Sequence, residues 1–258
     1  MASWHESAHA VYTRVLAHAL GCLGDATVWD APFSHTYFEG FFPADVYDAL
    51  LNHLPPADRY WAGPQDPNTR YQGRTLYNLT ASGVRGFPAR SRNLWRGVVA
   101  ALTDPELKRC LYARLAPDLI HRFGGEEAAV PHLAGFSRPT LYRDSEAFAI
   151  PPHPDTLKKV VTMHLYLPAD VSQLHLGTAL YARPSDRPQM DEPQRSFTVV
   201  KQFEFRPNSG YAFVVNNSGL RESWHGREPI PAGSGVRHTL LNTFYIEPRR
   251  DYSGYLED

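Results

Sequence analysis

Five side chains in the second half of the chain have the types and spacing of a metal site with an anion site beside it. They are His153 and Asp155 in AIPPHPDTLKKVV, His225 in ESWHGREP, and Arg237 and Thr239 in SGVRHTLLNTFYI. Side chains at i and i+2 of an extended segment point to the same face, so His153 and Asp155 can approach one ion together. A neutral imidazole and a carboxylate suit a divalent ion such as Fe(II), which needs a further ligand.

His225 is the candidate for that further ligand. It lies 70 residues after Asp155, on what we predict to be a late strand that can meet the first pair inside a small barrel. Two histidines and one carboxylate occupy one face of an octahedron and leave three positions open. The alternatives are a loop ion pair for His153 and Asp155, and a hydrogen-bonded core histidine for His225.

Arg237 predicts an anion site. It follows His225 by twelve residues and opens an alternating apolar run, where a buried guanidinium is costly unless it has an anion. Its N–H groups can hold a carboxylate, and Thr239 shares its face and offers a hydroxyl. The alternative is an ion pair with an internal acid such as Glu222. We expect Arg237 to face an open cavity, and burial against a protein acid in place of an open cavity would overturn the combined metal and anion site.

The bulk composition is that of a globular protein and argues against some functions. The chain has 258 residues, of which 26 are basic and 27 acidic, and a formal net charge of −1. This balance argues against capture of nucleic acid or of an anionic membrane surface. Cys22 and Cys110 have no metal or redox spacing, and we expect free thiols in a reducing compartment. The N-terminus lacks signal-peptide features and no apolar run reaches the roughly 18 residues of a membrane span, so we expect a cytoplasmic protein.

Residues 1–135 are predicted to be mainly helical support with one lid loop. Apolar residues at helical spacing mark 5–23 and 43–54. Two further helices are expected within 91–123, the second beginning at Asp104-Pro105 and ending before Gly124-Gly125. The segment 55–90 is rich in Pro, Gly, Arg and Tyr and is interpreted as a long loop, and long loops in compact domains are often functional.

After residue 135, short β-branched and aromatic runs alternate with Pro, Gly, Asn and Asp. Strands are predicted near 138–149, 159–167, 177–183, 196–205, 210–216, 221–226 and 236–247. Many short strands separated by turn signals favour a sandwich or a barrel. No flexible linker separates the two halves. We therefore expect one domain over 1–258, with a β core at 136–250 and the helices packed on the outside of one sheet.

The ordered pattern His153-x-Asp155, His225 and Arg237-x-Thr239 resembles the Fe(II)- and 2-oxoglutarate-dependent oxygenases. The likeness covers residues of about 137–247, and APFSHTYFEGFFPADVYDALLNHLP is similar to the opening of many bacterial members. The segments HPDTLKKVVTMHLYLP, HLGTALY and FRPNSGYAFVVNNSGLRESWHGREPI resemble a bacterial and phage branch often found near glycan or small-molecule modification genes.

The resemblance implies a fold and a metal. The fold is the double-stranded β-helix, a cupin-like jelly roll of two packed sheets flanked by N-terminal helices, in the α+β or mainly β class. The metal is Fe(II), bound by His153, Asp155 and His225.

The resemblance also implies a cosubstrate and a reaction. 2-Oxoglutarate would chelate the iron, and its far carboxylate would pair with Arg237, helped by Thr239 and by Tyr142 on the strand before the metal loop. Members of the family use dioxygen to oxidise a C–H bond of their substrate and release succinate and carbon dioxide.

Substrate contacts are predicted in NTRYQGRTLYNLT, because lids of this kind commonly close over the substrate in the family. Arg70 and Arg74 would suit a carboxylate or phosphate, and Tyr71 a ring or a sugar. The alternative is a solvated surface loop. Lys158 and Lys159 are expected to cap the metal loop on its solvent side, and the alternative is that one of them contacts an acidic substrate.

We therefore predict an enzyme that hydroxylates an unactivated C–H bond of a small molecule such as an amino acid, a sugar or a natural-product intermediate. Desaturation, ring formation and epimerisation stay open as outcomes of the same chemistry. Two other functions stay open: a jelly-roll binding protein without turnover, against which Arg237 argues, and a cupin-type isomerase or epimerase that needs no dioxygen. We expect no nucleic-acid or membrane partner. The oligomeric state is open, with a homodimer among the options.

Overall fold

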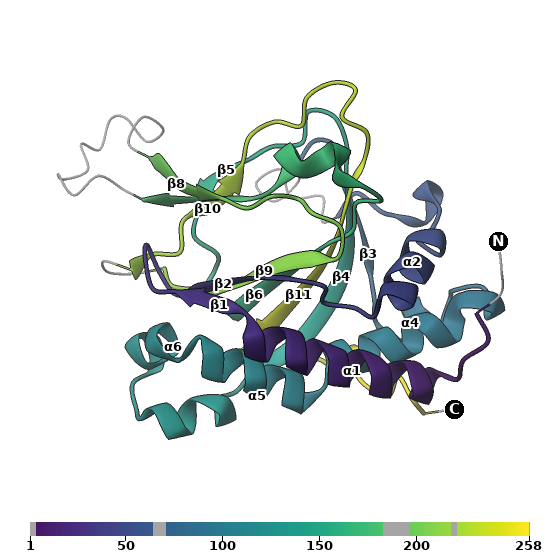
Figure 1. Ribbon diagram of the computed structural model, residues 1–258, viewed down its shortest axis with the longest axis horizontal. Helices are drawn as coiled ribbons and strands as arrows, with labels where there is room; N and C mark the ends of the chain where they lie inside the picture. Colours follow the sequence, from purple (N-terminus) through teal and green to yellow (C-terminus); the bar gives the residue numbers. More distant parts are fainter. Residues whose placement is uncertain (1–3, 64–70, 183–196, 218–220, 258) are drawn as a thin grey trace.

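The computed structural model describes residues 4–63, 71–182, 197–217 and 221–257, and it contains two antiparallel β-sheets with helices on one side (Figure 1). The helices are α1 (Ala8–Asp25), α2 (Ala44–Asn52), α3 (Ala81–Arg85), α4 (Ala89–Leu102), α5 (Pro105–Arg114) and α6 (Ala116–Phe123). The strands are β1 (Thr27–Trp29), β2 (His35–Glu39), β3 (Arg74–Asn78), β4 (Phe136–Asp144), β5 (Ile150–His153), β6 (Lys159–Tyr166), β7 (Ala179–Ala182), β8 (Thr198–Gln202), β9 (Ser209–Val214), β10 (His225–Arg227) and β11 (Arg237–Tyr245). In these ranges no helix is long and apolar enough to cross a membrane.

The two sheets form a sandwich. The larger sheet has seven strands in the order β1-β2-β9-β6-β11-β4-β3, and the smaller has four in the order β5-β10-β7-β8. Strands far apart in sequence are neighbours, because β2 pairs with β9 and β5 pairs with β10, in both cases antiparallel. The small sheet lies over one face of the large sheet and the helices cover the other face (Figure 1). This is the jelly roll that the sequence predicts.

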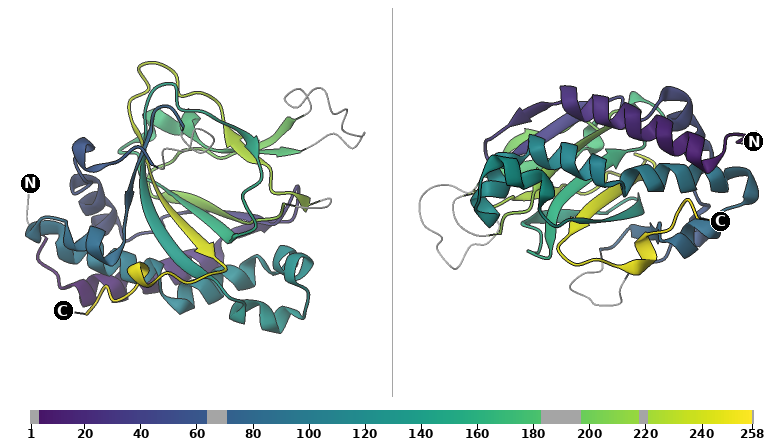
Figure 2. Two further views of the ribbon diagram at one scale, coloured as in Figure 1. Left: turned by 180° about the vertical axis from the view of Figure 1, so that it is seen from behind. Right: turned by 90° about the horizontal axis from the view of Figure 1, so that it is seen from below.

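Helices α1 and α4 pack closely against each other beneath the large sheet (Figure 2). The side chain of Ser7 caps α1 by accepting a hydrogen bond from the backbone N–H of Ala10. Apolar residues four apart, from Val11 to Leu23, form the buried face of α1. Helix α4 meets that face at Gly97, where an added Cβ would lie 2.5 Å from the Cβ of Val11, so a larger residue would push the two helices apart.

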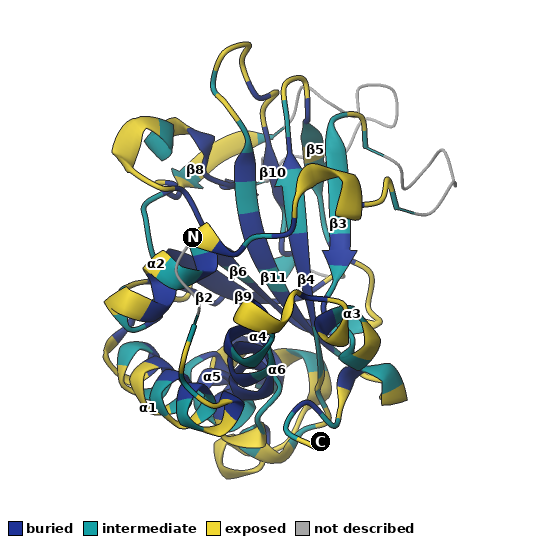
Figure 3. Ribbon diagram, turned by 90° about the vertical axis from the view of Figure 1, so that its right-hand side faces the viewer, coloured by how far each residue is buried: buried dark blue, intermediate teal, exposed yellow. Residues whose placement is uncertain are grey.

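The apolar interior has two parts. One lies between the helices and the large sheet and includes Leu94, Val98 and Leu240. The other lies between the two sheets and is mainly aromatic, with Tyr166 and Phe213 among its fully buried members. Figure 3 shows strands β6 and β11, which separate these two parts, buried along most of their length. Two apolar faces on one sheet explain why these strands are nearly continuous apolar runs.

The N-terminal half differs from the sequence prediction in two ways. Strands β1, β2 and β3 extend the two edges of the large sheet, so the segment 55–90 is not one long loop. These strands have three to five residues, too few for alternation to stand out. The helix predicted from Asp104 to Gly124 is two helices, α5 and α6, because Pro117 lacks the N–H that a continuous helix would use.

Candidate metal and anion site

A cavity of about 340 Å³ lies between the two sheets. Besides the three candidate metal ligands, its polar lining includes Arg74, Tyr142, Lys159, His164, Arg227 and Arg237. Small-molecule sites in proteins have volumes of roughly 300–1,000 Å³. The cavity therefore suits a cosubstrate-sized ligand together with a small second molecule or one end of a larger one.

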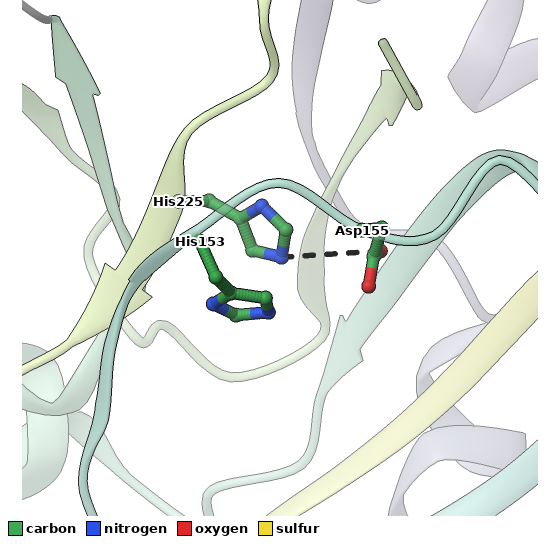
Figure 4. A group of neighbouring side chains, drawn as sticks. All are labelled: His153, Asp155 and His225. Atoms are coloured by element: carbon green, nitrogen blue, oxygen red, sulfur yellow. Dashed lines mark ion pairs between the residues drawn. The ribbon is translucent and has the colours of Figure 1, made fainter. Parts of the chain in front are cut away.

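His153, Asp155 and His225 point toward one another in this cavity (Figure 4). His153 ends β5, His225 begins β10, and the two are partners in the β5–β10 register, so their ring centroids lie 4.4 Å apart. Asp155 follows in the loop before β6, with its Oδ2 3.9 Å from Nε2 of His225. One ligand atom from each residue lies within 4.8 Å of the others, and no other such group of three occurs in the described ranges. The structure thus brings together the three predicted ligands.

The backbone fixes which nitrogen each histidine offers. Nδ1 of His153 is 3.0 Å from the carbonyl oxygen of Pro151, and Nδ1 of His225 is 2.9 Å from that of Ser223. A carbonyl only accepts hydrogen bonds, so Nδ1 carries the proton in both rings. Nε2 is then left with a lone pair, which is the form that binds a metal ion.

Asp155 is held by two neighbours from β6. Nζ of Lys159 is 2.5 Å from Oδ1, and the hydroxyl of Thr162 donates to Oδ2 at 2.8 Å. Burial tends to raise the pKa of Asp155, but Lys159 and His225 outweigh it and lower the pKa well below its ordinary value. Lys159 therefore does not lie on the solvent side, as the sequence suggested, because the first residue of β6 points toward the cavity.

The charge states of the three residues fit a divalent cation. Burial, followed by the neighbouring His153, lowers the pKa of His225 to about 4. Burial likewise lowers the pKa of His153. Two neutral imidazoles and one ionised carboxylate are thus present at neutral pH, and metal ligands must be in these deprotonated forms.

Arg237 is buried and forms an ion pair with Asp144. Its Nη1 donates to Oδ2 of Asp144 at 2.8 Å and its Nε to the carbonyl of Leu176 at 2.9 Å. The internal acid is thus Asp144, not Glu222, the partner considered from the sequence. The side chain of Arg237 nevertheless lines the cavity, so both predicted surroundings, an acid and a cavity, occur together.

A second arginine shares the same carboxylate. Nε and Nη2 of Arg74 donate to the two oxygens of Asp144 at 2.7 and 2.9 Å. Burial tends to raise the pKa of Asp144, but Arg74 and Arg237 outweigh it and lower the pKa. Two guanidinium groups around one carboxylate leave one positive charge, so this end of the cavity stays attractive to an anion despite the internal ion pair.

Tyr142 and Thr239 face each other across the β4–β11 register. Tyr142 lines the cavity, and the guanidinium carbon of Arg74 lies 4.5 Å from the centre of its ring. Thr239 is fully buried, and its hydroxyl has no hydrogen-bond partner among the residues described, but it does not line the cavity. Tyr142 is therefore better placed than Thr239 to contact a bound molecule.

The predicted substrate loop is in part a strand. Arg74 begins β3 and pairs with Asp144, so it belongs to the sheet and not to a lid. Its side chain is partly exposed and lines the cavity. Tyr71 also lines the cavity and packs edge-on against Phe148. Arg70 lies outside the described residues.

Sequence reasoning missed Arg227, which lines this cavity, and Asp144, which does not line it but pairs with the lining residues Arg74 and Arg237, and it left His164 undecided. Arg227 lies two residues after His225 on β10, and side chains at i and i+2 of a strand share a face. Its place in the cavity could therefore have been predicted from that of His225. His164 stacks on Tyr211 with ring centroids 4.8 Å apart. The sequence around Asp144 did not indicate its role, because its partner Arg237 lies 93 residues away.

No protein-family model and no curated protein matches the chain. Among solved structures, a prolyl-4-hydroxylase from Pseudomonas putida aligns over 90% of this chain and 99% of its own, with 16% identity and a TM-score of 0.50. A prolyl hydroxylase from Trichoplax adhaerens, in complex with a hypoxia inducible factor peptide fragment, aligns over 92% of this chain and 90% of its own, with 13% identity and a TM-score of 0.52. HygX from Streptomyces hygroscopicus, with nickel and 2-oxoglutarate bound, aligns over 82% of both chains, with 11% identity and a TM-score of 0.47.

The chain therefore has the fold of the two prolyl hydroxylases. The observed sheets form the double-stranded β-helix that the sequence predicts. At these identities the likeness is one of fold, and a shared fold alone does not determine the chemistry of the cavity.

Proposed function

We propose that the protein is an Fe(II)- and 2-oxoglutarate-dependent oxygenase that oxidises a small organic molecule. The observation that carries this proposal is the convergence of His153, Asp155 and His225 in a cavity that also contains arginine side chains. A metal site beside an anion site is what binding of a chelating dicarboxylate requires. The fold adds that two hydroxylases share this architecture.

The three ligands fit Fe(II). Two imidazole nitrogens and one carboxylate oxygen suit this ion and cover one face of its coordination sphere. Both histidines already present a lone pair at Nε2, and Asp155 is ionised. When bound, the iron would supply redox chemistry with dioxygen at the positions that the protein leaves open.

The far carboxylate of 2-oxoglutarate has a matching region around Arg237. Lys159 and Thr162 contact Asp155 at the start of β6, whereas β11 begins beside the end of β6, where Leu167 donates to the carbonyl of His238. A molecule bound to the metal can therefore extend along β6 toward Arg237. A guanidinium has five N–H donors, so Arg237 keeps donors besides those used by Asp144 and Leu176.

Tyr142, Tyr71 and Phe148 add aromatic walls to the cavity. Aromatic faces bind rings and the apolar faces of sugars. Together with the modest volume, they favour a small molecule with an apolar or ring-like part as the substrate. The reaction we propose is hydroxylation of one of its C–H bonds.

The decisive experiment is an anaerobic titration. Protein supplied with Fe(II) should develop a weak visible charge-transfer band as 2-oxoglutarate is added, and admission of air should release succinate. His225→Ala should abolish both signals while far-UV circular dichroism stays unchanged. If the wild-type protein gives neither band nor succinate, the proposed function is wrong.

Oxygen dependence separates this proposal from its alternatives. A cupin-type isomerase would turn over its substrate without air, and a jelly-roll binding protein would release no succinate under any condition. Turnover under ¹⁸O₂ would then distinguish hydroxylation from epimerisation, because only hydroxylation leaves labelled oxygen in the product formed from the organic substrate.

A further inference from the structure

Arg227 is a buried cation that lines the cavity and has no anionic partner among the residues that the structure describes. It ends β10, two residues after His225, and only 5% of its surface is exposed. Its Nε has no hydrogen-bond partner, and in the described part of the chain no ion pair involves Arg227. Burial of an unpaired charge is unfavourable, so the guanidinium is expected to have an anion during function.

Three arginines line this cavity, and two of them share one carboxylate. Arg74 and Arg237 both bond to Asp144, and Arg227 lines the same cavity as these two arginines. A guanidinium is charged at neutral pH, so Arg227 adds a third positive charge. Two positive charges therefore remain after Asp144 is counted. The far carboxylate of 2-oxoglutarate would neutralise one of them.

We propose that Arg227 binds an acidic group of the organic substrate, so that the substrate is a small carboxylic acid or an acid of similar charge. This inference rests on the proposed function, because it assigns the first positive charge to the cosubstrate. It follows from the different surroundings of the two arginines. Arg237 already has a carboxylate and a carbonyl as partners. Within the described ranges the side chain of Arg227 has neither, and its Nε donates to no acceptor there.

The location of Arg227 agrees with a role in selecting the substrate. It projects from the small sheet, on the strand that carries His225, whereas Arg237 projects from the large sheet. An acid held by Arg227 would therefore approach from the wall that holds two of the metal ligands. The cavity volume of about 340 Å³, shared with the cosubstrate, limits that acid to a small molecule or to the acidic end of a longer one.

The first arm of the test examines the cosubstrate. The affinity of Fe(II)-loaded protein for 2-oxoglutarate is measured anaerobically for the wild type, Arg227→Met, Arg237→Met and the exposed-arginine control Arg249→Met. We expect Arg227→Met and Arg249→Met to stay within about threefold of the wild type. Arg237→Met should bind 2-oxoglutarate about tenfold or more weakly, since a charge-assisted hydrogen bond contributes about 1.5–3 kcal/mol.

The second arm examines the substrate. Protein loaded with Ni(II) and 2-oxoglutarate is titrated with small hydroxy acids, amino acids and sugar acids, each paired with its neutral amide. At least one acid should bind about tenfold or more tightly than its amide. Arg227→Met should reduce that preference to near one, and Arg227→Lys should restore part of it, because lysine keeps the charge but not the planar donor geometry.

The outcomes separate this inference from the proposed function. Failure of the wild-type protein to bind 2-oxoglutarate with Fe(II) would overturn both. Normal binding of 2-oxoglutarate without preference for any acid over its amide would overturn only the role of Arg227. A loss of 2-oxoglutarate affinity in Arg227→Met, equal to that in Arg237→Met, would also overturn it, because Arg227 would then hold the cosubstrate.

Discussion

Arg237 and Asp144, which lie 93 residues apart in sequence, form a buried ion pair at the first register position of the β11–β4 pairing. Asp144 is fully buried and also accepts two hydrogen bonds from Arg74. The carboxylate thus holds two guanidinium groups in fixed positions on one wall of the cavity. Its removal would leave the buried Arg237 and the partly exposed Arg74 without their shared anion.

Replacement of Asp144 by Asn should destabilise the protein strongly. Breaking a buried ion pair by removing one partner costs about 3–5 kcal/mol, because the remaining charge is uncompensated. Urea denaturation followed by circular dichroism measures this loss, and added sulfate should restore part of it by binding the arginines. Asp251→Asn is the matched control, since Asp251 pairs with the exposed Arg249 and should cost less than about 1 kcal/mol. Equal effects of the two substitutions would contradict our account of Asp144.

Replacement of Thr162 by Val should weaken metal binding and preserve the fold. The hydroxyl of Thr162 orients Asp155 through a 2.8 Å hydrogen bond, and valine has nearly the same shape. Loss of a partner that orients a metal ligand lowers metal affinity about 10–100-fold. Calorimetric titration with Ni(II) measures the change. Thr162→Ser keeps the hydroxyl and should bind within a few-fold of the wild type, and a Val variant with unchanged affinity would show that this contact does not matter.

A bound metal should stabilise the protein, and only through the three ligands. A ligand that binds only the folded state at one hundred times its Kd adds about 2.7 kcal/mol to the free energy of unfolding. Thermal denaturation with and without Ni(II) should therefore show a higher midpoint for the loaded wild type. His225→Ala should lose the increase, whereas His132→Ala, which removes an exposed histidine, should keep it. A full increase in His225→Ala would place the ion elsewhere.

Stability should fall at mildly acidic pH, in part through His238. Burial, followed by Arg143, lowers the pKa of this histidine to about 4, whereas Asp144 acts in the opposite direction. The unfolded chain, with an ordinary histidine pKa of about 6.5, binds the proton more readily. The contribution of His238 is therefore complete above about pH 6.5 and is lost as the pH falls toward 4. His238→Asn should reduce the slope of unfolding free energy against pH in this window by up to about 1.4 kcal/mol per unit. An unchanged slope would contradict the assignment.

The candidate metal ligands were predictable from the sequence because two histidines and a carboxylate suit one divalent ion, and because a buried late strand can return beside an early one. Asp155 itself lies in the loop after β5 and not on the strand. His225 does lie opposite His153 in the register. Strand alternation would also have indicated Arg227, because it lies two residues after His225 on β10. Helix bounds were also close, since Ser7 and Asp104 provide capping side chains at the starts of α1 and α5.

The surroundings of Arg237 were not predictable in the same way. Its partner Asp144 comes from a different strand, and only the register of the large sheet brings the two together. Strand β3 was not predicted because five residues flanked by irregular segments show too little alternation of apolar and polar residues. Arg74 was therefore assigned to a loop. Contacts between distant segments depend on the pairing of whole strands, and single-chain patterns do not specify that pairing.

The carbonyl groups of Pro151 and Ser223 have a consequence for how an ion enters. Each carbonyl holds the imidazole that follows it by two residues, His153 for Pro151 and His225 for Ser223. Pro152 and Pro154 stiffen the backbone on either side of His153. The conformational entropy of the two imidazole rings is thus lost when the polypeptide folds and not when the cation binds. Capture should be fast and should leave the backbone unmoved, so that the apo and loaded forms superimpose around the centre and differ chiefly in their displaced solvent.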